Sequence, residues 1–310
     1  MTAMPLSNRN APAIRAEEAF RLFCSPEKHW PSNYRKLAQR ARFHLRHASV
    51  CRYGEIQTYI FEPSRKSRGT VLLVHGWGAE ASFLAAFAEP LRRLSFRVVA
   101  LDLPAHGRSG GTHTNLAACT RAAHRIADIF SPIAGMVGHS LGGLISLWVA
   151  EGGAPLAFPV PVAKLALLAC PNRFLDVTRT FGAELSLCMK AQLGFERRLS
   201  RVGHRPVESF SAVDLINRIG GDVMAVHSAD DEKVSFSDAE AIGAASPRVR
   251  LVACQGLGHS KLLYDPPVIR RVISFLCPDD ALPSAPTLPS RFSGDQQQNG
   301  ISIACLPVLI

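Results

Sequence analysis

Residues 133–143 read Ile-Ala-Gly-Met-Val-Gly-His-Ser-Leu-Gly-Gly, and this stretch decides how the rest of the sequence is interpreted. The apolar run 133–137 predicts a buried strand, and residues 141–151 are typical of a helix. Between them, residues 138–142 match the pattern G-x-S-x-G. A strand, a sharp turn and a helix in this order place the hydroxyl of Ser140 above the carboxyl edge of a sheet.

The two glycines of this pattern have a steric purpose. A serine on so tight a turn has a strained backbone, and side chains two residues before and after it would collide. Gly138 and Gly142 remove that collision, while the first N–H groups of the following helix favour negative charge near the hydroxyl. Three fixed residues occur by chance in about one chain of this length in ten, so the flanking strand and helix are what make the match specific.

Short apolar runs separated by helical stretches recur through the middle of the chain. Strands that are apolar on both faces are typical of a sheet covered by helices on both sides, and their alternation with helices predicts parallel crossovers. We therefore predict an α/β fold with a doubly wound, mostly parallel sheet. The predicted strands are 71–74, 97–101, 133–137, 164–169, 223–226 and 249–253. The predicted helices are 81–94, 115–130, 141–151, 237–245 and 266–276.

The chain divides into three predicted parts. Residues 1–41 form a basic extension in which apolar positions recur among charges, so two short amphipathic helices are expected between Arg15 and Arg42. The main domain is predicted at 42–278. Residues 279–310 are rich in Pro, Ser and Gln and predict a disordered tail.

Two features of the main domain depart from the regular alternation. Residues 43–50 and 55–61 predict an antiparallel hairpin that turns at Tyr53-Gly54. The interval 171–210 is far longer than one crossover helix needs, so a helical cap is predicted there. Helically spaced apolar residues in this interval are expected to form the core of the cap.

Composition and charge exclude several classes of protein. Hydrophobic residues make up 47% of the chain and charged residues 19%, which is typical of a globular protein and excludes wholesale disorder and collagen. The net charge is +10, and most of that excess lies in residues 1–68. Those residues lack a helix-turn-helix, zinc-finger or RNA-recognition signature, so no nucleic-acid partner is expected.

The cysteines and the hydropathy pattern bear on metal binding and location. Eight cysteines are scattered without a C-x-x-C pair or clustered His/Cys spacing, so reduced thiols and no metal site are expected. The first thirty residues mix charged and apolar positions, which disfavours a signal peptide. No apolar run is long enough for a spanning helix, and the expected location is the cytoplasm.

Four motifs make the sequence similar to the α/β-hydrolase family. They are His75-Gly76-Trp77-Gly78, residues 102–109, residues 138–143 and Gly256-Leu257-Gly258-His259. The similarity runs from about residue 70 to residue 276, and these versions of the motifs resemble bacterial esterase-like members. The resemblance implies a serine nucleophile, an acid after a late strand and a histidine near the end of the domain.

Carried over to this sequence, the resemblance implies that Ser140 is the nucleophile and His259 the base. A serine hydroxyl attacks only when a neutral imidazole removes its proton and returns it to the leaving group. Among 11 histidines, only His259 has both the position and the chain order Ser, Asp, His that the fold requires.

The acid is expected after the predicted strand 223–226, where Asp230 and Asp231 both lie. The family pattern has a valine three residues after the acid, which favours Asp231 because Val234 follows it. The same pattern has a glycine where this chain has Ser228. Asp230 therefore remains an alternative, as does Asp176 after the preceding strand.

The resemblance also implies that the backbone amides of Trp77 and Leu141 donate to the oxyanion. Trp77 is in addition a candidate wall of the acyl pocket. His75 is expected to brace its loop, and His106 and Asp102 are expected to shape the turn after the next strand.

These expectations describe a serine hydrolase of the carboxylesterase type that needs neither metal nor cofactor. It would cleave a carboxylic ester, or alternatively a thioester, through an acyl-enzyme on Ser140. The expected partner is a small acyl substrate with an apolar acyl group. Two alternatives stay open: an acyltransferase or cofactor-free perhydrolase with the same triad, and a non-catalytic binding protein on the same fold.

Overall fold

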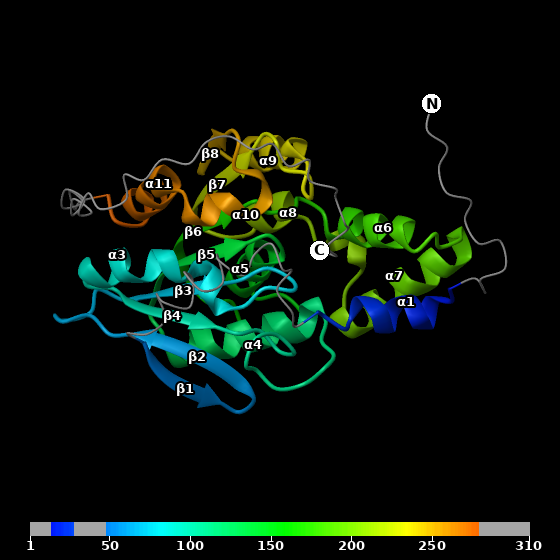
Figure 1. The fold of residues 1–310 in the computed structure, drawn as a ribbon, viewed down its shortest axis with the longest axis horizontal. Coiled ribbons are helices and arrows are strands. Elements are labelled where there is room, and N and C mark those ends of the chain that lie inside the picture. Colours follow the sequence, from blue (N-terminus) through cyan, green and yellow to red (C-terminus); the bar gives the residue numbers. More distant parts are fainter. Residues whose placement is uncertain (1–13, 28–47, 279–310) are drawn as a thin grey trace, which may run out of the picture.

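The computed structural model describes residues 14–27 and 48–278, and these contain a mixed sheet in the order β1-β2-β4-β3-β5-β6-β7-β8 (Figure 1). The first two pairs in this order are antiparallel and all later pairs are parallel. The strands are β1 Ser49–Tyr53, β2 Ile56–Phe61, β3 Thr70–Val74, β4 Arg97–Leu101, β5 Ile133–His139, β6 Val162–Leu168, β7 Asp222–Ser228 and β8 Val249–Cys254. The predicted α/β fold is confirmed.

Helices cover both faces of the sheet, and the strands contribute side chains to two separate cores. In β3, Leu72 and Val74 face one core, whereas Val71 and Leu73 face the other. This alternation explains why the strand is apolar at every position. The first core includes α4 Leu116–Ile129, α5 Leu141–Glu151 and α9 Phe236–Ala244; the second includes η3 Ala81–Phe87, α3 Ala88–Arg93, η5 Leu262–Tyr264 and α11 Pro266–Leu276.

One predicted helix differs from the structure. Residues 81–94 form a 3₁₀ helix followed by a short α-helix rather than one continuous α-helix. Pro90 lacks an N–H group and fits the first turn of an α-helix. The α-helix therefore begins at Ala88, two residues before this proline.

The cap consists of α6 Phe174–Glu184, α7 Met189–Gly203 and η4 Val207–Ser209, and α8 Ala212–Ile216 leads back to the sheet. The N-terminal helix α1 Ala16–Phe23 lies along α7 (Figure 1). Glu17 of α1 pairs with Arg198 of α7, and the Arg198 guanidinium lies 4.7 Å from the centre of the Phe20 ring.

The remaining N-terminal and C-terminal predictions are only partly covered by the described residues. β1 and β2 form the predicted antiparallel hairpin around Gly54, whose φ is +62°. Residues 43–47 of the predicted hairpin, the second predicted N-terminal helix and the tail 279–310 lie outside the described residues.

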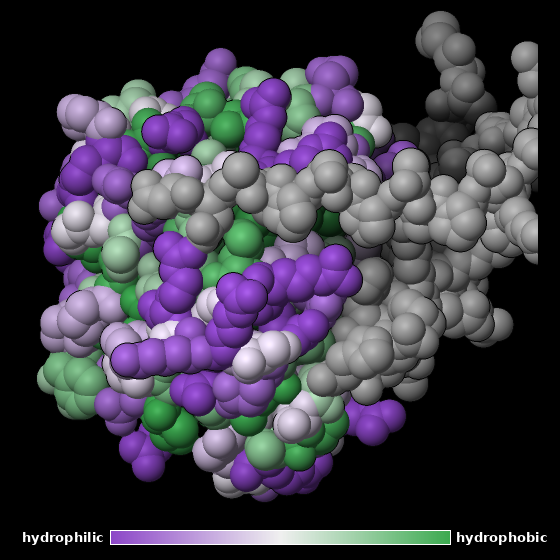
Figure 2. Space-filling model, turned by 90° about the vertical axis from the view of Figure 1, so that its left-hand side faces the viewer, coloured by the Kyte–Doolittle hydropathy of each residue, from purple (hydrophilic) through white to green (hydrophobic). Residues whose placement is uncertain are grey.

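The surface is mixed in polarity on the side that Figure 2 shows, where hydrophilic side chains extend between smaller hydrophobic areas. In the described part of the chain, none of the helices combines the length and the apolar character that crossing a bilayer requires.

The turn at Ser140 provides a test of the steric argument. A Cβ atom on Gly142 would lie 2.2 Å from the Val74 carbonyl oxygen and 2.5 Å from the His75 carbonyl oxygen. Both are backbone atoms, so we expect Gly142→Ala to destabilise the protein by at least about 2 kcal/mol and to lower Tm by roughly 4–8 °C. Thermal unfolding followed by circular dichroism measures the change.

Gly220→Ala is the matched control, because a Cβ atom at Gly220 meets nothing within 4 Å. This control should change the free energy of unfolding by no more than about 0.5 kcal/mol. Equal Tm values for the two variants would contradict the proposed close approach.

Candidate active site

Ser140 lies at the sharp turn between β5 and α5, as predicted. Its φ is +52°, in the left-handed region that is costly for a residue with a side chain. Two backbone hydrogen bonds hold the turn: Ser140 N–H donates to Leu168 O at 2.9 Å, and Gly143 N–H donates to Ser140 O at 2.9 Å. A Cβ atom on Gly138 would lie 2.5 Å from Gly142 O, so the two glycines of the pattern face each other.

The loop after β3 passes directly beside this turn. A Cβ atom on Gly76 would lie 3.0 Å from the Ser140 Cβ and 3.1 Å from His139 O, so glycine permits the approach. The Trp77 amide follows, and within residues 14–27 and 48–278 it has no hydrogen-bond acceptor. Leu141 is the first residue of α5, where a backbone N–H has no partner inside the helix.

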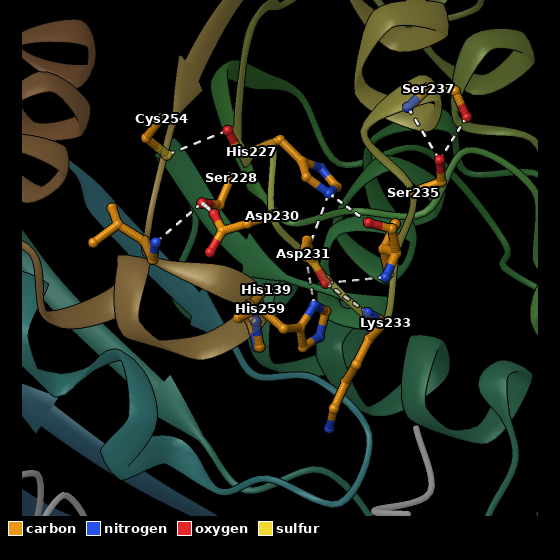
Figure 3. Close-up of polar contacts among 12 residues, drawn as sticks. His139, His227, Ser228, Asp230, Asp231, Lys233, Ser235, Ser237, Cys254 and His259 are labelled. Carbon is orange, nitrogen blue, oxygen red and sulfur yellow. Dashed lines mark hydrogen bonds and ion pairs between the residues drawn. The ribbon is translucent and has the colours of Figure 1, made fainter. Parts of the chain in front are cut away.

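His259 and Asp231 are in direct contact (Figure 3). The His259 Nδ1 lies 2.8 Å from the Asp231 Oδ2, and the Asp231 side chain is fully buried. His259 belongs to the short helix α10 Gly258–Lys261, which follows β8 after a turn in which Gly256 and Gly258 have positive φ. Because the carboxylate accepts a proton from Nδ1, the Nε2 of His259 is the nitrogen with a free lone pair.

Within the described residues, four groups surround the two oxygens of Asp231. Its Oδ1 accepts from the backbone N–H groups of Lys233 at 2.8 Å and Val234 at 3.1 Å. Its Oδ2 accepts from His259 and also lies 3.3 Å from the Nε2 of His227. Burial opposes ionisation, but the hydrogen bonds from His227 and His259 outweigh it and hold the pKa of Asp231 well below its usual range.

His227 is a site residue that the sequence analysis missed. It lies near the end of β7 and its side chain is 1% exposed. Its Nε2 is 3.0 Å from Val234 O, and because a carbonyl only accepts, Nε2 carries the proton that also reaches Asp231. The available sequence signal is a histidine four residues before Asp231, directly after the predicted strand.

His139 connects the serine turn to His259. Its Nε2 donates to the His259 carbonyl oxygen at 3.0 Å, and the two imidazole rings lie 4.8 Å apart. Burial and the nearby His259 lower the pKa of His139 to about 3, so this ring stays neutral. The residue directly before Ser140 therefore contacts the histidine that the sequence predicts as the base.

In the described structure, two of the three predicted triad residues are in direct contact. Asp231 and His259 share a direct hydrogen bond, whereas Ser140 is connected to His259 through His139. In the described residues, the Ser140 hydroxyl has no hydrogen-bond partner. Hydrogen bonds between a nucleophile and its base are commonly long without substrate and tighten when substrate binds.

The two alternative acids make other contacts. The Asp230 Oδ1 accepts from Ser228 Oγ and from Gly256 N–H at 2.8 Å, so Asp230 fastens the end of β7 to the loop that carries His259. These hydrogen bonds lower the pKa of Asp230. Asp176 lies in the first turn of α6, where it is half exposed and 3.9 Å from Arg173.

His75 braces the loop beside Ser140. Its Nδ1 donates to Gly76 O at 2.7 Å, which leaves Nε2 to accept from Leu103 N–H at 2.9 Å. Burial lowers the pKa of His75 well below its usual range, so the ring stays neutral. His75 thus joins the loop after β3 to the loop after β4.

Asp102 organises the turn after β4. It accepts from the backbone N–H groups of Ala81 and Arg108, each at 2.8 Å. Burial raises the pKa of Asp102 in spite of these hydrogen bonds. Across the residues that the structure describes, no His, Cys, Asp or Glu side chains form a group of three or more suited to a metal ion.

Comparisons with known proteins show which proteins the chain resembles. Two curated relatives are pimeloyl-[acyl-carrier protein] methyl ester esterases. The one from Klebsiella pneumoniae is 30% identical over 143 residues, which cover 46% of this chain and 51% of the relative. The one from Chromobacterium violaceum is 38% identical over 109 residues, which cover 34% and 38%. The chain spans about half the length, or less, of these relatives.

Two solved structures show the same fold at low identity. A putative lipase from Acinetobacter baumannii is 17% identical with a TM-score of 0.57, covering 80% of this chain and 97% of its own. Est1E from Butyrivibrio proteoclasticus, solved with ferulic acid bound, is 20% identical with a TM-score of 0.58, covering 74% and 96%.

The family comparison covers most of the chain and includes all four motifs discussed above. The model of the alpha/beta hydrolase family matches residues 71–297. The chain therefore belongs to the alpha/beta hydrolase family.

Proposed function

We propose that this protein is a serine hydrolase that cleaves a carboxylic ester, or a thioester, through an acyl-enzyme on Ser140. The observation that carries the proposal is the 2.8 Å hydrogen bond between Asp231 and His259, formed beside a serine on a strained turn. The esterase names of the curated relatives support an ester as the bond cleaved.

In the proposed first step, the His259 Nε2 removes the proton of the Ser140 hydroxyl as its oxygen attacks the ester carbonyl carbon. Asp231 keeps the Nδ1 tautomer of His259 and stabilises the imidazolium that forms. The imidazolium then gives its proton to the leaving alcohol, and an acyl-Ser140 ester remains. Water, activated by the same imidazole, then attacks the acyl carbon; the bond to the Ser140 oxygen breaks, the imidazolium returns the proton to that oxygen, and the carboxylic acid is released.

The negative charge on the carbonyl oxygen would be stabilised by the N–H groups of Trp77 and Leu141. Each such donor contributes about 2.7–4 kcal/mol to the stability of the transition state. Trp77 lacks a competing acceptor in the described residues, and Leu141 adds the favourable dipole at the start of α5. Phe23 stacks on Trp77, and the cap rings of Phe174 and Phe181 pack on Phe23. These apolar surroundings of Trp77 favour an apolar acyl group.

Replacement of the nucleophile is the first test. We expect Ser140→Ala to lower kcat for p-nitrophenyl esters by at least about 10³-fold and to abolish labelling by a fluorophosphonate, because no oxygen remains to form the covalent bond. Turnover and labelling of the folded variant, with Tm measured in parallel, check this. A label retained on the variant would remove Ser140 from this role.

The choice of acid gives a second test with a matched neighbour. Asp231→Asn should lower kcat by about 10⁴-fold, because the amide disfavours the required tautomer and does not stabilise the imidazolium. Asp230→Asn removes only a loop contact and should lower kcat by less than about tenfold. The steady-state kinetics of both variants decide the matter, and the reverse order of losses would assign the acid to Asp230.

The proposed mechanism requires Asp231 to be ionised, which stability measurements test. The pKa of Asp231 is depressed in the folded protein, while its unfolded value is about 3.9. The stabilisation from ionised Asp231 is therefore present above about pH 4 and lost as the pH falls further. Below pH 4, the stability difference between wild type and Asp231→Asn should decrease by at most about 1.4 kcal/mol per pH unit.

Urea unfolding of both proteins between pH 3 and pH 5 measures this difference. Asp222→Asn, at an exposed position at the start of β7, serves as a control for the general effect of removing one carboxylate. A stability difference that does not change with pH over this range would contradict an ionised, strongly hydrogen-bonded Asp231.

A further inference from the structure

Phe23, the last residue of α1, lies at the centre of a cluster of aromatic rings between the cap and the site. Its ring stacks on the indole of Trp77 with a centroid distance of 5.6 Å and an angle of 20°. It also meets three cap rings edge-on, those of Phe174 at 6.0 Å, Phe181 at 5.0 Å and Phe195 at 5.4 Å. The N-terminal helix therefore contacts the proposed oxyanion loop and the cap through one side chain.

The same ring is the first member of a continuous series that ends at the brace of the oxyanion loop. Trp77 packs edge-on against His106 at 5.1 Å, and His106 lies 5.2 Å from His75. His75 is the residue that bonds Gly76 O and Leu103 N–H. The Trp77 side chain is thus held between the N-terminal helix and the His75–His106 pair.

The helix that carries Phe23 is itself fixed on two sides. Gly194 of α7 allows close packing, because a Cβ atom there would lie 2.7 Å from the Ala16 Cβ. Glu17 of α1 forms an ion pair with Arg198 of α7. Directly after α1, Thr114 N–H donates to Cys24 O at 2.7 Å, which ties the segment to the loop before α4.

We propose that Phe23 is a positioning residue for the oxyanion loop, so that α1 is part of the working active site. This inference rests on the proposed function. The stacked Phe23 ring limits the positions that the Trp77 indole can take. The indole in turn limits the position of the Trp77 backbone amide, which follows Gly76 directly. Preorganised donors are effective only when they are correctly placed, and an error of about 1 Å in such a site costs about 10²-fold in rate.

Phe23→Leu tests the proposal, and Phe195→Leu is its matched control. Both changes replace a buried ring of the same cluster by an aliphatic side chain, but only Phe23 contacts Trp77. We expect Phe23→Leu to lower kcat for a p-nitrophenyl ester by at least about tenfold with KM changed less than about threefold. The rate of fluorophosphonate labelling of Ser140 should fall in parallel.

The Phe195→Leu variant should keep kcat within about threefold of wild type. Equal kcat losses in the two variants, or a Phe23→Leu loss confined to KM, would overturn the proposal and leave Phe23 a packing residue of the cap. Tm values for both variants set a temperature at which each is folded.

A second variant displaces α1 without changing any aromatic ring. In Gly194→Leu, the new side chain on α7 would collide with the Ala16 Cβ of α1. Leucine is itself well tolerated in a helix such as α7. This variant should reproduce the kcat loss of Phe23→Leu. Faster proteolysis at the N-terminus than in wild type shows that α1 is displaced. A displaced α1 with unchanged kcat would overturn the proposal. A wild-type protein without turnover or labelling would instead overturn the proposed function itself.

Discussion

The strained backbone at Ser140 depends on the absence of side chains where β3, β5 and α5 meet. Any Cβ atom on Gly142 would overlap the carbonyl groups of Val74, the last residue of β3, and of His75, which follows it, and one on Gly138 would overlap Gly142 itself. The same lack of a side chain at Gly76 lets the next loop reach Ser140. Close backbone packing at these three positions sets the height of the hydroxyl above the sheet edge and the position of the amides beside it.

Hydrogen-bond donors stabilise the negative charge of the buried Asp231 carboxylate. Burying a carboxylate is costly unless hydrogen bonds replace its water. Two backbone N–H groups serve one oxygen, while His259 and His227 both serve the other. His227 is also bonded to Val234 O, so the two imidazoles and the turn after β7 form one connected unit. This unit fixes the orientation of His259 before any substrate binds.

Local patterns in the sequence predict most of the fold, because the buried parallel strands are short apolar runs separated by longer helical stretches. The pattern fails at 81–94, where the structure has a 3₁₀ helix up to Phe87 and an α-helix from Ala88, with Pro90 in the first turn of the α-helix. The triad candidates follow from resemblance and spacing. The spacing to Val234 favours Asp231 but leaves Asp230 as an alternative, because the contact of a carboxylate with His259 is formed only by folding. The contacts of Phe23 and His227 depend on tertiary packing. The local spacing of apolar residues in the sequence does not predict them.

The docking of α1 on α7 joins the first described helix to one that follows it by more than 160 residues. During synthesis at about 5–20 residues per second, the apolar side of α1 leaves the ribosome on the order of ten seconds before its binding surface exists. Phe23, which is buried in the finished protein, lacks its partner Phe195 of α7 during that interval, whereas another partner, Trp77, is synthesised much earlier. The docking of α1 on the cap is therefore complete only after α7 has been synthesised.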